Sequence, residues 1–412
     1  MPSAKPDPPA PLKTEVGLPV LKNYSARDYK GSPQVWTILQ DRRGVMFFGD
    51  SSSAMLEYDG VTWRKIFVPS SVVRSLSTDD TGKIWVGVNG NFGYLSPDAA
   101  GTLHFVSIIE NVPAQDRSFT DVWQTLITPQ GVFFRSYERL FRWDGKHMHV
   151  WSHQPKSRFQ ALSAIRGRMF TAQDGVGLQE IVGDELRSVP GGDSYRNSRK
   201  LFLQPFDESH ILISARDQLL TLYDGQTVTP FPTEADEYLT KYKVYTSTLL
   251  SDGSLCLTTL NGGAVILGHD GKLRQIIDKS AGLLSSNILS AYQDREGALW
   301  LGLDDGVARV EINSPISIFS LGGTFDSARF KAHIYASSGG GDAAVQRLDT
   351  DPKTGRSSLV PLRGSTQAFT LAVFKDPTGK TPEQLLAATS EGCDEGGGRL
   401  ACSGHAGGTR FQ

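Results

Sequence analysis

Short runs in which apolar and polar residues alternate, separated by turns rich in Gly and Asp, recur along most of this sequence. The clearest copy spans residues 282–302. Residues 288–293 alternate in polarity, Asp294 and Gly297 bracket a tight turn, and the Leu-Trp-Leu run at residues 299–301 resumes the strand pattern. A single β-hairpin is at best marginally stable in water, so this unit must stack on others like it.

Copies of this hairpin unit can be aligned on their turns. Each contains an inner strand, a hairpin, a second strand, a third strand that ends in a Tyr-Asp-Gly or Trp-Asp-Gly turn, and a short outer strand. The turns recur at intervals of roughly 35 to 50 residues, the length of one four-stranded propeller blade. Seven copies precede residue 312, with turns at Gly44, Gly82, Gly131, Gly167, near Glu208, Gly253 and Gly297. No window shows sustained helical periodicity. The sequence therefore predicts an all-β fold, a β-propeller of seven four-stranded blades, and disfavours an α/β enzyme.

The copies divide the chain into four regions. Residues 1–17 are a Pro-rich N-terminus that we expect to be disordered, and residues 18–319 form the seven-bladed propeller. Residues 320–392 contain looser blade-like units, which indicate either the incomplete start of a second propeller or a poorly ordered tail. Residues 393–412 are a Gly-rich tail that we expect to be disordered.

The ring needs a seal, because an unpaired edge strand invites aggregation. The sequence offers two candidates. Residues 19–24 have the pattern of an outer strand whose inner strands lie elsewhere, and residues 315–319 are contiguous with the seventh blade. We favour the first, in which the ring is closed by strands from both ends of the propeller.

Composition narrows the class of partner. The 412 residues carry 42 Lys plus Arg against 44 Asp plus Glu, so no basic field suggests nucleic acid as a partner. No stretch approaches the roughly 20 apolar residues of a membrane span. Residues 1–11 lack the apolar segment of a secretory signal.

Candidate metal and cofactor chemistry is sparse. Cys256 lies in a strand pattern and is expected to be a small buried hydrophobe, so the three cysteines predict neither a disulfide framework nor a structural zinc. His147, His149 and His153 form the one histidine cluster, and no Cys or carboxylate completes a tetrahedral set for them. We predict no metal and no cofactor.

Aligning the inner strands brings out a second set of residues. Five residues before each turn position lie four aromatic side chains and one guanidinium: Trp36, Arg74, Trp123, Phe159 and Tyr245. If the copies superpose, these side chains form a ring at one level of the centre, where aromatics with an Arg would suit stacking on a sugar or another flat ligand. The alternative is that they pack between adjacent blades, because strand alternation allows either face.

The last copy carries a recognisable motif. It reads Asn-Ile at 287–288, Asp-Arg-Glu-Gly at 294–297, Leu-Trp-Leu-Gly at 299–302 and Gly-Val-Ala-Arg-Val at 306–310. This motif closely resembles the two-component regulator propeller repeat, with weaker matches at residues 41–49 and 79–87. The resemblance covers residues 18–319 well and 328–392 loosely. Members of that family are similar in having a sensory propeller, a small β-sandwich, a membrane helix and a cytoplasmic output module, and only the propeller is visible here.

The resemblance implies a function. It implies a non-catalytic sensory propeller that binds an unknown small molecule or glycan, singly or as a paired or dimeric sensor. It also implies an extracytoplasmic, periplasmic location and a membrane-linked histidine kinase or cyclase module as partner, although a cytoplasmic location stays open because no signal peptide is visible.

Two other function classes stay open. One fold hosts many functions, so a propeller carbohydrate-active enzyme, a lyase or glycosidase, is an alternative, and it predicts converging carboxylates or a Tyr-His pair. The other is a protein-interaction scaffold, which predicts an exposed apolar patch on the rim.

Overall fold

The computed structural model describes residues 17–314, 316–319, 323–338, 344–350, 357–362, 368–378, 380, 382–389, 392–395, 398–399 and 407–411. The chain divides into two compact units. One comprises residues 21–313, and the other comprises residues 1–20 and 314–412. The fold is all-β and rich in four-stranded antiparallel sheets, which confirms the predicted fold class.

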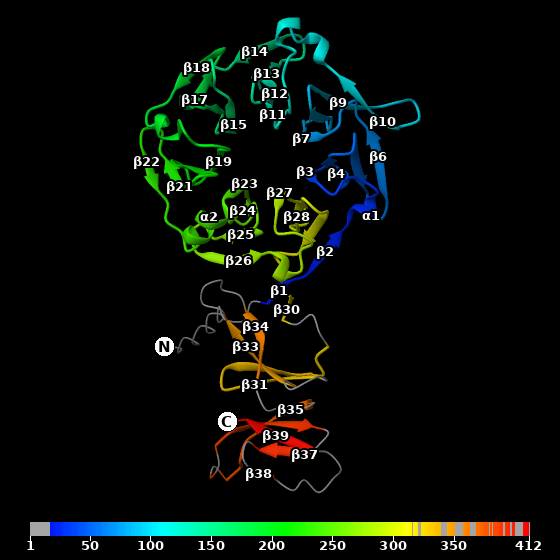
Figure 1. Cartoon of the computed structure of the whole chain (residues 1–412), viewed down its shortest axis with the longest axis vertical. Helices are drawn as coiled ribbons and strands as arrows, with labels where there is room; N and C mark the ends of the chain where they lie inside the picture. The colour runs from blue at the N-terminus through cyan, green and yellow to red at the C-terminus, as the bar shows by residue number, and fades with distance from the viewer. Residues whose placement is uncertain are drawn as a thin grey trace, which may run out of the picture. The chain divides into compact units, whose positions relative to one another are not determined.

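Seven four-stranded antiparallel sheets surround a common centre in the unit of residues 21–313 (Figure 1). The first three blades are β3 (Val35–Gln40), β4 (Met46–Asp50), β5 (Ala54–Tyr58) and β6 (Trp63–Phe67); β7 (Val73–Thr78), β8 (Ile84–Val88), β9 (Asn91–Pro97) and β10 (Leu103–Ser107); and β11 (Gln124–Thr128), β12 (Gly131–Arg135), β13 (Arg139–Trp143) and β14 (Met148–Ser152). The next three are β15 (Phe159–Ile165), β16 (Arg168–Gln173), β17 (Gly177–Val182) and β18 (Glu185–Ser188); β19 (Phe202–Pro205), β20 (Ile211–Ala215), β21 (Gln218–Tyr223) and β22 (Val228–Pro230); and β23 (Val244–Leu249), β24 (Leu255–Thr259), β25 (Ala264–Leu267) and β26 (Leu273–Ile277). Two short helices, α1 (Ala26–Tyr29) and α2 (Asp236–Tyr242), lie in the connections.

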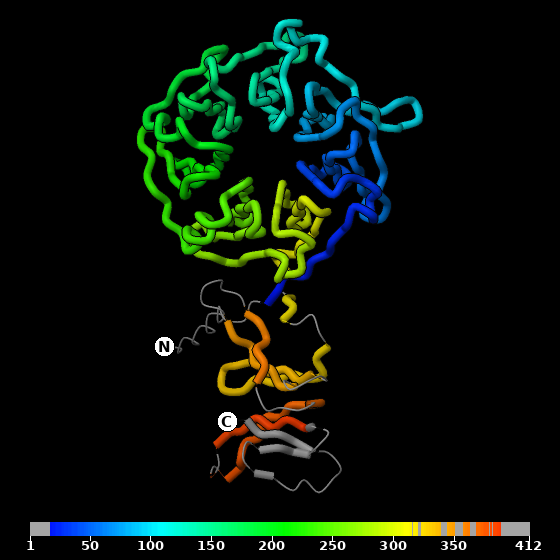
Figure 2. The backbone as a smooth tube through the Cα atoms, in the orientation of Figure 1, coloured from blue at the N-terminus to red at the C-terminus, as the bar shows by residue number. Residues whose placement is uncertain are grey.

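The seventh blade closes the ring with a strand from the start of the chain. It contains β27 (Ile288–Gln293), β28 (Leu299–Leu303), β29 (Val307–Val310) and β2 (Leu21–Tyr24). β2 pairs antiparallel with β29, and the tube in Figure 2 shows this blue segment joining the yellow blade. The first of the two predicted seals is therefore confirmed. Within the other unit, β1 (Leu18–Pro19) pairs with β30 (Ser317–Ile318).

The hairpin turn of the repeat is built by its aspartate. In the seventh blade, Asp294 accepts a hydrogen bond of 2.8 Å from Trp300 Nε1, and Gly297 adopts a φ of 92°, which favours glycine. The second blade repeats this geometry, with 2.9 Å between Trp85 Nε1 and Asp79. The predicted role of Asp294 and Gly297 in a turn is confirmed.

A small residue near the end of the second strand lets adjacent blades approach closely. A Cβ on Gly302 would lie 2.5 Å from the backbone oxygen of Val35, and a Cβ on Gly87 would lie 2.6 Å from Cγ1 of Val122. Val35 is the first residue of β3, and Val122 lies two residues before β11, so both contacts are with the start of the next blade. The corresponding residue is small in six blades and is Arg135 in the third; in blade order the six are Gly49, Gly87, Ala172, Ser214, Thr258 and Gly302.

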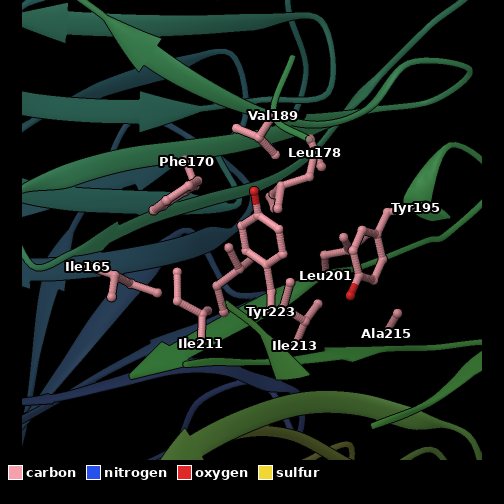
Figure 3. Close-up of a cluster of buried hydrophobic side chains, with 13 residues drawn as sticks. Ile165, Phe170, Leu178, Val189, Tyr195, Leu201, Ile211, Ile213, Ala215 and Tyr223 are labelled. Atoms are coloured by element: carbon pink, nitrogen blue, oxygen red, sulfur yellow. The ribbon is translucent and has the colours of Figure 1, made fainter. Parts of the chain in front are cut away.

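The apolar core of the ring lies between neighbouring blades. Figure 3 shows the cluster between the fourth and fifth blades, where Phe170 and Ile211 come from different sheets and the ring of Tyr223 lies among the surrounding side chains. Between the seventh and first blades, the ring centroid of Trp300 lies 5.4 Å from that of Phe48, so this side chain packs between the two blades. Cys256 is fully buried, as its strand position predicts.

The other unit contains two further sheets. β31 (Asp326–Phe330), β32 (His333–Ser337), β33 (Val345–Thr350) and β34 (Ser357–Pro361) form an antiparallel sheet with the strand order of a blade. β35 (Ala368–Phe374), β36 (Gln384–Thr389), β37 (Gly392–Glu395), β38 (Gly398–Arg399) and β39 (Gly407–Phe411) form a sheet in which β37 and β39 run parallel. The stretch 393–412, for which the sequence predicts disorder, therefore contains short strands where it is described. Of the N-terminus predicted to be disordered, residues 1–16 lie outside the described residues.

Candidate ligand-binding cavity at the centre of the ring

Five of the seven inner strands have a β-bulge, which changes the direction of one side chain in each of those five strands. In β3, β7, β15, β23 and β27, the register with the second strand shifts immediately after the first residue. The bulged residues are Trp36, Arg74, Gln160, Tyr245 and Leu289. In the third blade, Trp123 directly precedes β11.

These side chains line a single cavity of about 250 Å³, bordered by the inner-strand segments of all seven blades. Four of the five residues that the sequence predicts to form a ring are among them: Trp36, Arg74, Trp123 and Tyr245. The lining also includes residues that come from other positions of the blades, notably Arg135, Tyr137 and Lys200.

Arg74 combines contacts with aromatic rings and a carboxylate. Its guanidinium carbon lies 3.9 Å from the ring centroid of Trp36 and 4.5 Å from that of Trp123, within reach of cation–π attraction. Its Nη2 lies 2.9 Å from a carboxylate oxygen of Asp121. Its Nε and Nη1 are buried, and no hydrogen-bond partner for either lies in the described part of the chain. Arg74 therefore keeps two unused donors beside the cavity.

Lys200 also lines the cavity, and its ammonium nitrogen lies 3.6 Å from the ring centroid of Tyr245 and 4.9 Å from that of Trp123. Burial, followed by the positive charges of Arg216, Arg135 and Arg74, lowers the pKa of Lys200 to about 7. Burial also raises the pKa of Tyr245 to about 12. At neutral pH, Lys200 is therefore poised between its charged and neutral forms, and Tyr245 stays protonated.

Arg135 is a buried cation with well-defined partners. Its Nε donates to Gln124 Oε1 at 2.6 Å, and its Nη1 donates to the backbone oxygen of Phe159 at 2.8 Å. Burial lowers the pKa of Arg135 to about 10, so the side chain still carries its charge at neutral pH.

A second cavity, of about 490 Å³, adjoins the central one and shares Tyr137, Gln160 and Lys200 with it. The rest of its lining is four cations and one carboxylate: Lys156, Arg158, Arg199, Arg216 and Asp174. Asp174 accepts a hydrogen bond of 3.1 Å from Gln160 Nε2. Positive charge therefore outweighs negative charge around both cavities.

Phe159, the fifth residue of the predicted ring, does not face the cavity. Its side chain is fully buried between the third and fourth blades, in a cluster with Trp151 and Leu162. The hairpin after β15 is shorter than the Asp-x-x-Gly hairpins, since Ile165 already pairs with Arg168. Counting back from the turn therefore reaches the wrong residue, and Gln160 is the one that faces the cavity.

Sequence reasoning missed Arg135 and Lys200. Arg135 occupies the position that is glycine in three other blades, so a comparison of the second strands could have revealed it as the exception. Lys200 lies in the loop before β19 with a φ of 51°, outside the repeated pattern. No spacing in the sequence pointed to it.

Replacing Lys200 with Met is expected to stabilise the chain near neutral pH. The folded-state pKa of Lys200 lies well below its ordinary value of 10.5, so between about pH 7 and pH 10 the unfolded state binds the extra proton and stability falls as the pH falls. Lys200→Met removes this pH dependence. Chemical denaturation should therefore show that the substitution raises the free energy of unfolding more at pH 7 than at pH 9.5. Lys65→Met, at an exposed position, is the control. Equal gains at both pH values would contradict the expectation.

Two of the three histidines that lie close together in the sequence, His147 and His149, contact different partners. The ring centroid of His149 lies 4.1 Å from that of Trp151, and His147 Nδ1 lies 3.6 Å from a carboxylate oxygen of Asp144. Among the described residues, no group of three His, Cys, Asp or Glu side chains could hold a metal ion.

Comparison with known proteins identifies the repeat. Residues 282–305 match the family model described as the two component regulator propeller. This segment is similar to a two-component regulator propeller repeat. It contains β27 and β28 of the blade that closes the ring, and the match confirms the resemblance seen in the sequence. No curated protein matches the sequence of the chain significantly.

Solved structures share the propeller fold at low sequence identity. The extracellular domain of a putative hybrid two-component system from B. thetaiotaomicron is 14% identical with a TM-score of 0.65, over 91% of this chain and 53% of that one. The extracellular domain of a putative one-component system from the same organism is 16% identical with a TM-score of 0.54, over 97% and 54%. Virginiamycin B lyase from Staphylococcus aureus is 11% identical with a TM-score of 0.53, over 71% and 98%. The chain thus spans about half the length of the two extracellular domains.

The helices within the described residues are short. None is long and apolar enough to cross a membrane.

Proposed function

We propose that this chain is the ligand-binding sensory propeller of a bacterial signal-transduction protein. The observation that carries the proposal is a contrast between two sets of residues: those that build the blades repeat along the chain, whereas those that line the central cavity differ from blade to blade. Turn aspartates and small residues recur from blade to blade, whereas the bulged residues differ in chemistry and line one cavity. The family match and the likeness to extracellular sensor domains support a sensory role. By the same analogy, the propeller lies in the periplasm and passes its stimulus to a membrane-linked histidine kinase or cyclase module.

Binding, rather than catalysis, is the role that we propose for the central cavity. Its lining, which lies wholly in the described part of the chain, includes no histidine, cysteine or carboxylate. Lys200, Tyr137 and Tyr245 are the groups in this lining that could move a proton, and the Lys200 ammonium lies over the ring face of Tyr245. A lyase activity, as in virginiamycin B lyase, is the alternative that the test below distinguishes.

Thermal unfolding of the full chain tests the binding role. In a panel of acidic and neutral monosaccharides and disaccharides at millimolar concentration, we expect at least one compound to raise the unfolding midpoint by several degrees. Mass spectrometry should recover that compound unchanged. Trp36→Ala should remove the shift, whereas Arg187→Met, a charge removal on the outer strand β18, should retain it. Conversion of the compound into a product, or an undiminished shift in Trp36→Ala, would argue against the proposal.

The signalling role is tested on the complete gene. We expect the reading frame that contains this chain to encode a membrane-spanning helix and a histidine kinase or cyclase module. In membranes that contain the complete protein, a compound that saturates the cavity should change the activity of that module. An output that does not respond to a saturating ligand would contradict the signalling role.

A further inference from the structure

We infer that the central cavity binds a small oxyanion: a single-ring or short-chain molecule with a carboxylate, phosphate or sulfate group, held mainly by Arg74 and Lys200. The inference names the ligand class for the proposed sensory function and rests on that function. It comes from the contacts of the cations that line the cavity.

Two aromatic rings of the cavity each have a cation over one face. The Arg74 guanidinium lies 3.9 Å from the ring centroid of Trp36, and the Lys200 ammonium lies 3.6 Å from that of Tyr245. Cation–π contacts of this length hold the cation over the ring. The chemistry that these pairs present to a ligand is therefore positive charge, and stacking on a sugar face is secondary.

The cations of the cavity are incompletely neutralised. Arg74, Arg135 and Lys200 line it, and the lining includes no carboxylate. Asp121 pairs with Arg74 through the single contact to Nη2, while no carboxylate of the described residues lies within 4 Å of the Lys200 ammonium. Like charges repel strongly where water is scarce. A bound anion would relieve this repulsion.

Unused donors point the same way. Nε and Nη1 of Arg74, Nε1 of Trp123 and Nε of Arg216 are all buried, and none has a hydrogen-bond partner within the described part of the chain. Buried donors in folded proteins nearly always have an acceptor. Oxyanions are the acceptors that guanidinium groups bind most strongly. We therefore assign the Arg74 and Trp123 donors, whose residues line the central cavity, to the ligand.

The size of the cavity and its surroundings limit the ligand further. A volume of about 250 Å³ lies below the roughly 300 Å³ at which typical small-molecule pockets begin, so one ring fits and a long oligomer does not. The adjoining basic cavity, with Lys156, Arg158 and Arg199 in its lining, raises the local concentration of anions.

Isothermal titration calorimetry with the full chain tests the inference. The probes are D-glucuronate, D-glucose 6-phosphate and D-glucose 6-sulfate, with D-glucose as the neutral molecule of the same ring. We expect at least one acidic probe to bind at least about tenfold more tightly than glucose, and more tightly at pH 6 than at pH 8, with uptake of a proton. The affinity should fall as the salt concentration rises.

Variants locate the binding. Arg74→Met and Lys200→Met should each lower the affinity for the acidic probe by at least about tenfold. Arg187→Met, which removes an exposed cation, should leave that affinity unchanged. Circular dichroism confirms that each variant is folded. Comparing the affinities for the three acidic probes shows whether the cavity prefers a carboxylate, a phosphate or a sulfate.

Three outcomes would overturn the inference: no acidic probe binds, glucose binds as tightly as the acidic probes, or an acidic probe binds equally well to both cavity variants. If glucose binds and Trp36→Ala removes that binding, the sensory proposal stands while the oxyanion inference fails. If no probe or panel compound responds to any cavity substitution, both fail.

Discussion

Truncating the chain to begin at Ser25 is expected to abolish its cooperative unfolding transition. The truncation removes β2, which pairs with β29 along four residues and completes the seventh blade. It also removes Tyr24, whose ring centroid lies 5.8 Å from that of Trp300 between the seventh and first blades. Without β2, the ring has an open edge at the point where its two ends meet. Urea unfolding followed by circular dichroism should show a broad, low-midpoint transition, and size-exclusion chromatography should show aggregates.

A chain that begins at Gly17 is the matched control. It retains every described strand, including β1 and β2, and should unfold with the midpoint of the full chain. An unchanged, cooperative transition in the chain that begins at Ser25 would contradict the closure by β2.

Replacing Phe159 with Ala is expected to destabilise the chain by about 3–5 kcal/mol, because a large, fully buried side chain leaves a cavity between two blades. The affinity for any ligand of the central cavity should stay the same, since Phe159 reaches the site only through its backbone oxygen, which accepts from Arg135. Urea unfolding measures the loss of stability, and isothermal titration calorimetry measures the ligand affinity.

Trp36→Ala is the matched comparison, because this residue lines the cavity. It should lower ligand affinity more strongly than Phe159→Ala does. Should Phe159→Ala fail to fold, Phe159→Leu, with a smaller loss of volume, allows the same measurement. A loss of ligand binding in folded Phe159→Leu would show that Phe159 belongs to the site.

The fold was largely predictable because its frame repeats. An Asp that accepts from a Trp six residues later, as Asp294 does from Trp300, has a fixed spacing that a linear pattern can carry. The seal at β2 was predictable for a related reason, since an outer strand without inner partners stands out at the start of the chain. By contrast, the mixed order of the sheet with β35 and β39 depends on long-range pairing, to which no repeat points.

The candidate site was predictable where the repeat is regular. Trp36, Arg74 and Tyr245 lie on bulges at the same position of their inner strands, Trp123 directly precedes β11, and all four line one cavity. The prediction failed at Phe159, where a shorter hairpin changes the count by one residue. Arg135 and Lys200 were missed because one replaces a glycine and the other lies in a loop between blades.

The contacts also change the expected chemistry of the site. From the sequence, the aromatic residues suggested stacking on a sugar. In the structure, Trp36 and Tyr245 each have a cation over a ring face. The sequence could not show this pairing, because it depends on contacts such as that between Lys200 and Tyr245 across blades.

The most direct test of a ligand site at the centre of the ring is a crystal structure of the chain with a saturating oxyanion, D-glucuronate or whichever acidic probe binds most tightly. We expect the carboxylate or ester group within hydrogen-bond distance of Arg74 Nε or Nη1 and of the Lys200 ammonium, inside the cavity that Trp36 and Tyr245 border. A probe bound on the rim of the propeller, with the central cavity empty at a saturating concentration, would contradict this account.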